Sequence, residues 1–102
     1  MVLYGGVIMH KYAVEYTDTF GGEANYCWVK RASIAVPEWP AFKGWDGNGR
    51  REPKGYQAAV MRRAKAAMGL SGVRGVTASL GDGYEFRPYG MATVLFVTYS
   101  EA

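Results

Sequence analysis

The chain of 102 residues has the length of one domain, and its hydrophobic content of 49% is enough for a packed core. Its net charge of +3 is weaker than the dense basic stripe of a dedicated nucleic-acid binder. The one cysteine, Cys27, excludes an internal disulfide and fits a reducing compartment, where we expect it to be a small core residue. No apolar run is long enough to span a membrane, and the first residues lack the features of a signal peptide. These properties predict a single cytoplasmic domain, 1–102, with no membrane association and no need of a cofactor.

The first convincing element is a strand over residues 9–17. Tyr12, Val14 and Tyr16 alternate there with other residues, which is the period-2 pattern of a half-buried strand. We expect residues 1–8, which precede this strand, to be a flexible tail or an added edge segment.

A polar turn over residues 18–23 leads into a second strand over residues 24–36. The turn contains a glycine pair, and its six residues make it longer than a tight hairpin turn. The alternation of the second strand breaks near Lys30 and Arg31, which predicts a bulge or an exposed end there. Residues of one parity in the two strands should form one wall of the core: Tyr12, Val14, Tyr16, Tyr26 and Trp28.

Residues 37–53 form a long loop with three prolines and three glycines, which exclude regular structure. A loop this long in a compact domain is usually functional or disordered, and its three large rings argue against disorder. The rings could fold back over one end of the sheet, or they could form a partner surface, since aromatic residues beside arginine are typical of interface hot spots. The second interpretation predicts these partner contacts: Trp39, Phe42, Trp45, Arg50 and Arg51.

A helix is predicted from residue 53 or 54 to residue 68. Its apolar stripe has the spacing of three and four residues that one helix face requires, and we expect its members to pack on the core: Tyr56, Ala59, Val60, Ala64, Ala67 and Met68. Gly69 is the expected stop. Cations are dense in the loop and on this helix. They could be an ordinary solvated face, or they could bind nucleic acid or an acidic protein surface, with loop aromatics stacking on unpaired bases. The candidate contacts are Lys43, Lys54, Arg62, Arg63 and Lys65.

Three antiparallel strands are predicted after the helix, over residues 73–80, 84–87 and 91–99. The turn Gly81–Asp82–Gly83 is a hairpin signal, and the last strand is apolar on both parities, which favours a central place in the sheet. The predicted fold is therefore α+β. It has an antiparallel sheet of four or five strands in the order ββαβββ, with one helix on one face. An exposed edge strand could pair in a homodimer.

Residues for catalysis or metal binding are sparse. One histidine, His10, and Cys27 are too few for a structural zinc site, and Asp46 begins only a fragment of a calcium loop. Two pairs of carboxylates flank turns, and we interpret them as solvated turn residues. A small enzyme would have to use His10, Cys27, Asp18 or Glu23.

Residues 16–29, Tyr-Thr-Asp-Thr-Phe-Gly-Gly-Glu-Ala-Asn-Tyr-Cys-Trp-Val, resemble small uncharacterised proteins of bacteriophages and prophages of proteobacteria. Residues 62–74 are similar to such proteins as well. The resemblance implies an accessory protein that binds and blocks a host protein, for example an anti-CRISPR that blocks a host defence effector. The resemblance implies no catalytic residues for this chain. The first hypothesis is therefore a non-enzymatic binder of a host protein, the second a nucleic-acid-binding accessory protein, and the third a small enzyme.

Overall fold

The computed structural model describes residues 2–4, 7–42, 45, 47 and 52–100. Its elements, in chain order, are β1 (Val2–Tyr4), β2 (Val7–Phe20), β3 (Glu23–Pro37), the 3-10 helix η1 (Trp39–Ala41), α1 (Tyr56–Ala67), β4 (Gly75–Leu80), β5 (Gly83–Pro88) and β6 (Thr93–Ser100).

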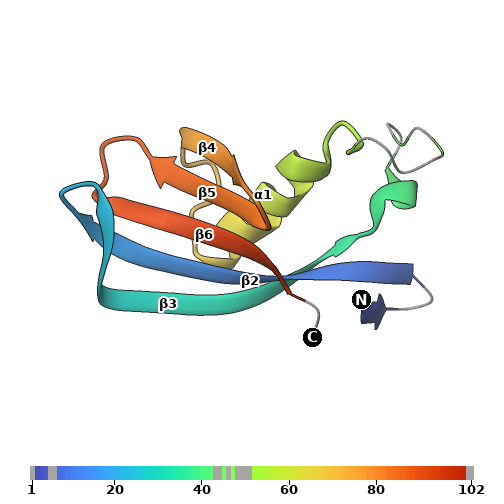
Figure 1. Ribbon diagram of the computed structural model, residues 1–102, viewed down its shortest axis with the longest axis horizontal. Helices are drawn as coiled ribbons and strands as arrows, with labels where there is room; N and C mark the ends of the chain where they lie inside the picture. Colours follow the sequence, from blue (N-terminus) through green and yellow to red (C-terminus); the bar gives the residue numbers. More distant parts are fainter. Residues whose placement is uncertain (1, 5–6, 43–44, 46, 48–51, 101–102) are drawn as a thin grey trace.

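The long strand β2 is the centre of the sheet (Figure 1). Along one side it pairs with β3, and along the other it pairs with β6, through residues 11–18 of β2. Met9 of β2 pairs with Pro37 of β3 on one side and with Val2 of β1 on the other, so β1 lies on the same side of β2 as β6, nearer to the start of β2. Beyond β6 follow β5 and then β4, and every pairing is antiparallel. The predicted α+β fold and the predicted central position of the last strand are confirmed, and residues 2–4 add a short sixth strand.

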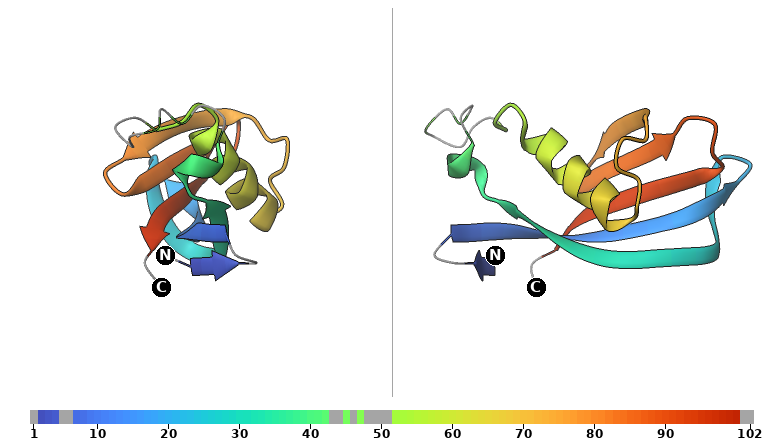
Figure 2. Two further views of the ribbon diagram at one scale, coloured as in Figure 1. Left: turned by 90° about the vertical axis from the view of Figure 1, so that its right-hand side faces the viewer. Right: turned by 180° about the vertical axis from the view of Figure 1, so that it is seen from behind.

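One face of this sheet is covered by α1, which lies across the strands (Figure 2). The predicted face of Tyr12, Val14 and Tyr16 is buried beneath the helix, as the alternation indicated. β5, β6 and the end of β3 add residues of matching parity, so the core has these main members: Tyr12, Val14, Tyr16, Val36, Tyr56, Val60, Met61, Ala64, Phe86, Leu95 and Val97. Met61, and not Ala67 as predicted, belongs to the buried stripe of the helix.

A glycine with positive φ lies just outside each end of α1. Gly55, with φ of 88°, precedes the first helical residue, which lies two to three residues after the predicted start. At the other end, Gly69 has a φ of 73° and the backbone N–H of Leu70 donates to the carbonyl of Lys65 at 2.7 Å. This bond closes a Schellman motif and lets the buried Leu70 side chain join the core, so the prediction of Gly69 as the stop is confirmed.

The hairpin of β2 and β3 differs from the prediction at its end. Its turn is only Gly21–Gly22, both with positive φ, because β2 continues to Phe20 and β3 begins at Glu23. The register shifts between Thr17 and Thr19, where β3 carries a bulge that lies before, and not at, the predicted Lys30–Arg31 position.

The bulge explains why part of the predicted core wall is wrong. Tyr26, with a φ of 54°, is 50% exposed and Trp28 is 42% exposed, although Trp28 keeps an edge contact with the ring of Tyr16 at 5.3 Å. Cys27, which was expected in the core, is also exposed. The backbone turns outward at this point, so the period-2 pattern no longer assigns a side chain to a face.

The carboxylate of Asp18 holds the bulge in place. It accepts hydrogen bonds from the backbone N–H groups of Cys27 at 2.8 Å and Trp28 at 3.4 Å, and from the amide Nδ2 of Asn25 at 2.9 Å. These donors favour the charged carboxylate, with the Asn25 bond first among them, and so hold the pKa of Asp18 below its usual value.

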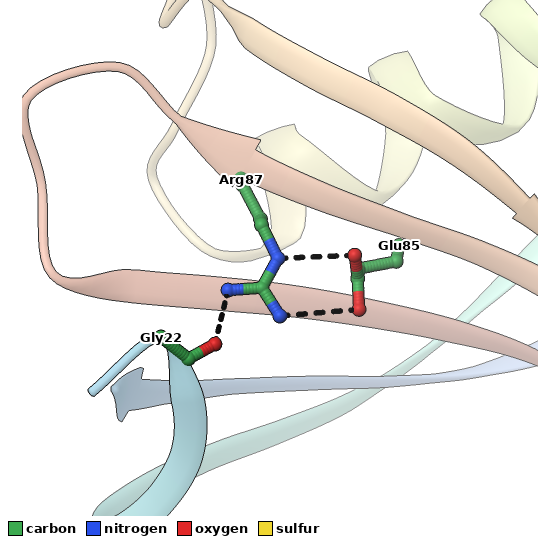
Figure 3. A network of polar contacts seen from close by, with 3 residues as sticks. All are labelled: Gly22, Glu85 and Arg87. Carbon is green, nitrogen blue, oxygen red and sulfur yellow. Dashed lines mark hydrogen bonds and ion pairs between the residues drawn. The ribbon is translucent and has the colours of Figure 1, made fainter. Parts of the chain in front are cut away.

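The tip of the hairpin bends toward β5 (Figure 3). Nη1 of Arg87 donates to the carbonyl of Gly22 at 2.7 Å, while Nε of the same guanidinium forms an ion pair with Glu85 at 3.0 Å. The ion pair is partly exposed and contributes little stability by itself. Its effect is to orient the guanidinium, so that one arginine joins β5 to a turn 65 residues earlier in the chain.

Candidate functional site: an aromatic cleft

A cleft of about 460 Å³ lies at the end of the sheet where β2 begins and β6 ends. The start of α1, the η1 turn and the β4–β5 turn form the rest of its wall. Its side chains are mainly aromatic, with two carboxylates: His10, Tyr12, Trp39, Tyr56, Tyr84, Tyr99, Glu52 and Asp82.

Sheet register and helix packing bring these rings together. Tyr12 and Tyr99 are direct cross-strand partners on the helix-covered face, with ring centroids 5.7 Å apart. The ring of Tyr56, the first residue of α1, has edge contacts with Trp39 at 6.0 Å and with His10 at 6.3 Å. These five rings come from β2, β6, η1 and α1, and together they make a preformed aromatic surface.

The tyrosine hydroxyls in the cleft are paired with other groups. The hydroxyls of Tyr12 and Tyr56 lie 2.7 Å apart, and the hydroxyl of Tyr84 donates to Oε1 of Glu52 at 2.9 Å. Burial raises the pKa of all three tyrosines, because it disfavours the phenolate. Like any tyrosine hydroxyl they are neutral near pH 7, and the shift extends this neutral form to higher pH.

The charge of the cleft wall is negative. Glu52 and Asp82 line it, and among the described lining residues there is no lysine or arginine. The faces of aromatic rings carry negative partial charge, so rings and carboxylates favour the same kind of ligand group, a cation. The arrangement suits an ammonium, an alkylated ammonium or a guanidinium.

The predicted loop aromatics lie beside this cleft. Trp39 is in its wall, and Phe42 packs against Tyr56 with ring centroids 5.2 Å apart. Both rings are half-buried against the core, as the first of the two interpretations of the loop expected. Trp45 is half-buried, and its backbone N–H donates to the carbonyl of Phe42 at 3.1 Å. A partner-binding role for these rings stays a prediction, and Lys43, Arg50 and Arg51 lie outside the described residues.

The predicted cations of the helix have different surroundings. Lys54 and Arg62 are exposed. Arg63 donates from Nη1 to the carbonyl of Ala35 in β3, and Nζ of Lys65 lies 4.4 Å from the ring centroid of Phe86. Two of these four cations are therefore engaged within the protein, and nucleic-acid binding stays a prediction.

The residues proposed for a small enzyme are not brought together. His10 is in the cleft at the start of β2, whereas Asp18 is roughly 26 Å away along the same strand. Cys27 and Glu23 belong to the hairpin end with Asp18. Within residues 2–4, 7–42, 45, 47 and 52–100 there is no group of three metal-ligating side chains, and no described helix is long and apolar enough to cross a membrane.

The sequence reasoning missed the cleft, because it assigned Tyr12 and Tyr56 only to the core and gave Glu52, Asp82 and Tyr84 no site role. A usable signal was present, since a buried tyrosine hydroxyl requires a hydrogen-bond partner and eight tyrosines are unusual in so short a chain. Comparison of the chain with protein-family models, curated proteins and solved structures found no match.

Proposed function

We propose that the protein acts by binding a partner protein, and that a cationic side chain of this partner enters the aromatic cleft. One observation carries the proposal. The described wall of the cleft combines aromatic rings from β2, β6, η1 and α1 with the carboxylates of Glu52 and Asp82, and it contains no lysine or arginine. Aromatic cages of this composition bind ammonium and guanidinium groups.

The fixed positions of the tyrosines support a binding role. The hydrogen bonds between Tyr12 and Tyr56 and between Tyr84 and Glu52 hold the rings in place. A cleft whose walls are already ordered loses less conformational entropy when a ligand binds. The resemblance of residues 16–29 to phage and prophage proteins supports a host protein as the partner, with blocking of that protein as the result. An anti-CRISPR protein would act in this way.

The chemistry of the cleft can be tested with small cations. The N-acetylated amides of trimethyl-lysine and of arginine are titrated into labelled protein, and NMR chemical shifts are followed. N-acetyl-norleucine amide, which carries no charge, is the control of similar length. A cation–aromatic contact is worth about 0.5 kcal/mol when exposed and about 2 kcal/mol when desolvated, which predicts roughly 2- to 30-fold tighter binding of the cations. Equal binding of N-acetyl-norleucine amide would contradict the proposal.

Matched tryptophans locate the effect. Trp39→Ala removes part of the cleft wall, whereas Trp28→Ala removes a ring that is 42% exposed at the other end of the sheet. We expect Trp39→Ala and Glu52→Gln to weaken cation binding and Trp28→Ala to leave it unchanged.

The partner role is tested by capture from a proteobacterial lysate with the same three variants. Capture of a specific protein by the wild type and by Trp28→Ala, but not by Trp39→Ala, is the expected result. A captured protein that Trp39→Ala and Glu52→Gln bind as well as the wild type would show that the cleft is not the binding surface.

A further inference from the structure

The carboxylate of Glu52 in the aromatic cleft is anchored to the sheet by a buried tyrosine. The hydroxyl of Tyr84 in β5 donates to Oε1 of Glu52 at 2.9 Å, and Tyr84 is only 7% exposed. Glu52 itself is exposed, and an exposed glutamate side chain normally samples many rotamers. The bond from Tyr84 therefore fixes the direction of a carboxylate that would otherwise move freely.

The anchored carboxylate lies close to the tyrosine hydroxyls of the cleft and keeps an oxygen for a ligand. Burial has the largest effect on the pKa of Tyr12, Tyr56 and Tyr84, and the charge of Glu52 raises all three values further. An effect on all three places the carboxylate near each of the hydroxyls. Oε1 takes the bond from Tyr84, whereas Oε2 has no partner among the described residues. Oε2 is therefore an acceptor in the cleft wall.

The second carboxylate, that of Asp82, comes from the turn between β4 and β5. The carbonyl of Asp82 accepts a hydrogen bond from the backbone N–H of Tyr99 at 2.8 Å, which ties this turn to the end of β6. Asp82 and Glu52 thus reach the cleft from two separate parts of the chain. Among the described lining residues no lysine or arginine is present to bind their oxygens, so a ligand has to supply the donors.

The cations that suit an aromatic cleft differ in their ability to donate hydrogen bonds. A quaternary ammonium has no N–H group, so it can contact the rings but leaves both carboxylates without a donor. The ammonium of lysine donates, but it is a compact and strongly hydrated charge. A guanidinium is planar and weakly hydrated, and it stacks on aromatic faces while the N–H groups at its edge donate to carboxylates. It is therefore the cation that can use the rings and the carboxylates together.

We propose that the cleft is specific for the guanidinium of an arginine side chain of the partner, and that Tyr84 positions Glu52 to accept a hydrogen bond from it. This inference rests on the proposed function, because it names the cation that the cleft selects. The aromatic rings of the wall stack on the plane of the guanidinium, and Glu52 and Asp82 accept from its edge. Tyr84 acts through Glu52 and is a positioning residue. Preorganisation of the acceptor lowers the entropy lost on binding.

The relative affinities of capped amino acids test the specificity. N-acetyl-arginine amide, N-acetyl-trimethyl-lysine amide and the neutral N-acetyl-norleucine amide are titrated into labelled protein, and Kd is measured from NMR chemical shifts. We expect the arginine amide to bind at least about threefold more tightly than the trimethyl-lysine amide, because only the guanidinium donates to the carboxylates. Equal or tighter binding of the trimethyl-lysine amide would overturn this inference, and the proposed function would stand if both cations still bind more tightly than norleucine amide. If neither cation does, the proposed function fails and this inference fails with it.

Variants of the anchoring bond test the role of Tyr84. Tyr84→Phe keeps the ring and the charge of the cleft but releases Glu52, so it should weaken binding of the arginine amide at least about twofold and leave binding of the trimethyl-lysine amide unchanged. Tyr89→Phe, which removes the hydroxyl of a residue that is 66% exposed and outside the cleft wall, should change neither affinity. Glu52→Gln alters an exposed residue without touching the core, and it should also reduce the preference for arginine. Equal losses for both cations in Tyr84→Phe, or a full preference for arginine in Tyr84→Phe or Glu52→Gln, would overturn the inference.

Discussion

Replacing Tyr56 by Phe removes one hydroxyl, but we expect it to lower the free energy of unfolding by more than the net value of one hydrogen bond. The side chains of Tyr12 and Tyr56 belong to residues that are only 6% and 3% exposed, and their hydroxyl oxygens lie 2.7 Å apart. Without the Tyr56 hydroxyl, the hydroxyl of Tyr12 stays buried and loses this partner. The net loss of a hydrogen bond together with an unsatisfied buried group gives about 1–3 kcal/mol for the single variant.

A double-mutant cycle separates the bond from the packing. Tyr12→Phe should cost a similar amount, but the double variant leaves no unpaired hydroxyl and should cost about 1 kcal/mol or less. The coupling between the two sites is the sum of the two single costs minus the cost of the double variant, which gives about 1–5 kcal/mol, well above the additivity limit for independent sites. Tyr89→Phe is the control, because Tyr89 is 66% exposed, and its effect should stay within about 0.5 kcal/mol.

Equilibrium unfolding in urea, followed by tryptophan fluorescence, measures each corner of the cycle. Thermal unfolding gives a second reading, since each 1 kcal/mol corresponds to about 4–8 °C in Tm for a domain of this size. If the free energies of the two single variants simply add in the double variant, the hydroxyls do not interact and the reasoning is refuted.

Three other changes test different parts of the structure. The contribution of the buried tyrosines to the free energy of unfolding should be constant below pH 10 and should fall above it, because the unfolded chain releases protons that the raised folded-state pKa values retain. The fall should be up to about 1.4 kcal/mol per pH unit for each tyrosine, and Tyr56→Phe should make it shallower in urea titrations between pH 8 and 11. Gly83→Ala should destabilise by about 1–3 kcal/mol, since its Cβ would collide with the carbonyl of Val97, whereas Gly81→Ala meets no atom within 4 Å and equal Tm losses for the two variants would contradict this. Asp18→Ala should loosen the bulge, and the backbone amides of Cys27 and Trp28, which donate to the Asp18 carboxylate, should exchange their hydrogens faster. Unchanged protection of these amides would mean that the bulge does not depend on Asp18.

The parts of the fold that depend on local patterns could be predicted. Tyr12 and Val14 face the core because alternation in β2 is regular, and Gly69 ends the helix because a left-handed residue is needed there. The bulge could not be predicted, because it depends on a carboxylate that binds amides nine and ten residues further along the chain. A periodic pattern carries no information about such a contact, so the alternation wrongly predicted that Trp28 is buried in the core.

The candidate site was harder to predict than the fold for a related reason. Tyr12, Tyr56 and Tyr84 each have the pattern of a core residue, and they are indeed buried. Their hydroxyls become a site only when the start of α1 is placed over the strands, with Glu52 close enough to accept from Tyr84. Tertiary packing decides that arrangement, whereas the sequence showed only that many tyrosines would need partners.

The position of β6 beside the central strand has a consequence for biosynthesis. Residues 93–100 pair with residues 11–18, so β2 is without a partner on one side until nearly the whole described chain has left the ribosome. At about 5–20 residues per second this interval lasts several seconds, during which the unpaired backbone edge of β2 is open to chaperones and to other nascent chains. Folding of this protein should therefore be post-translational, and a chain that stalls before β6 should be a target for proteolysis.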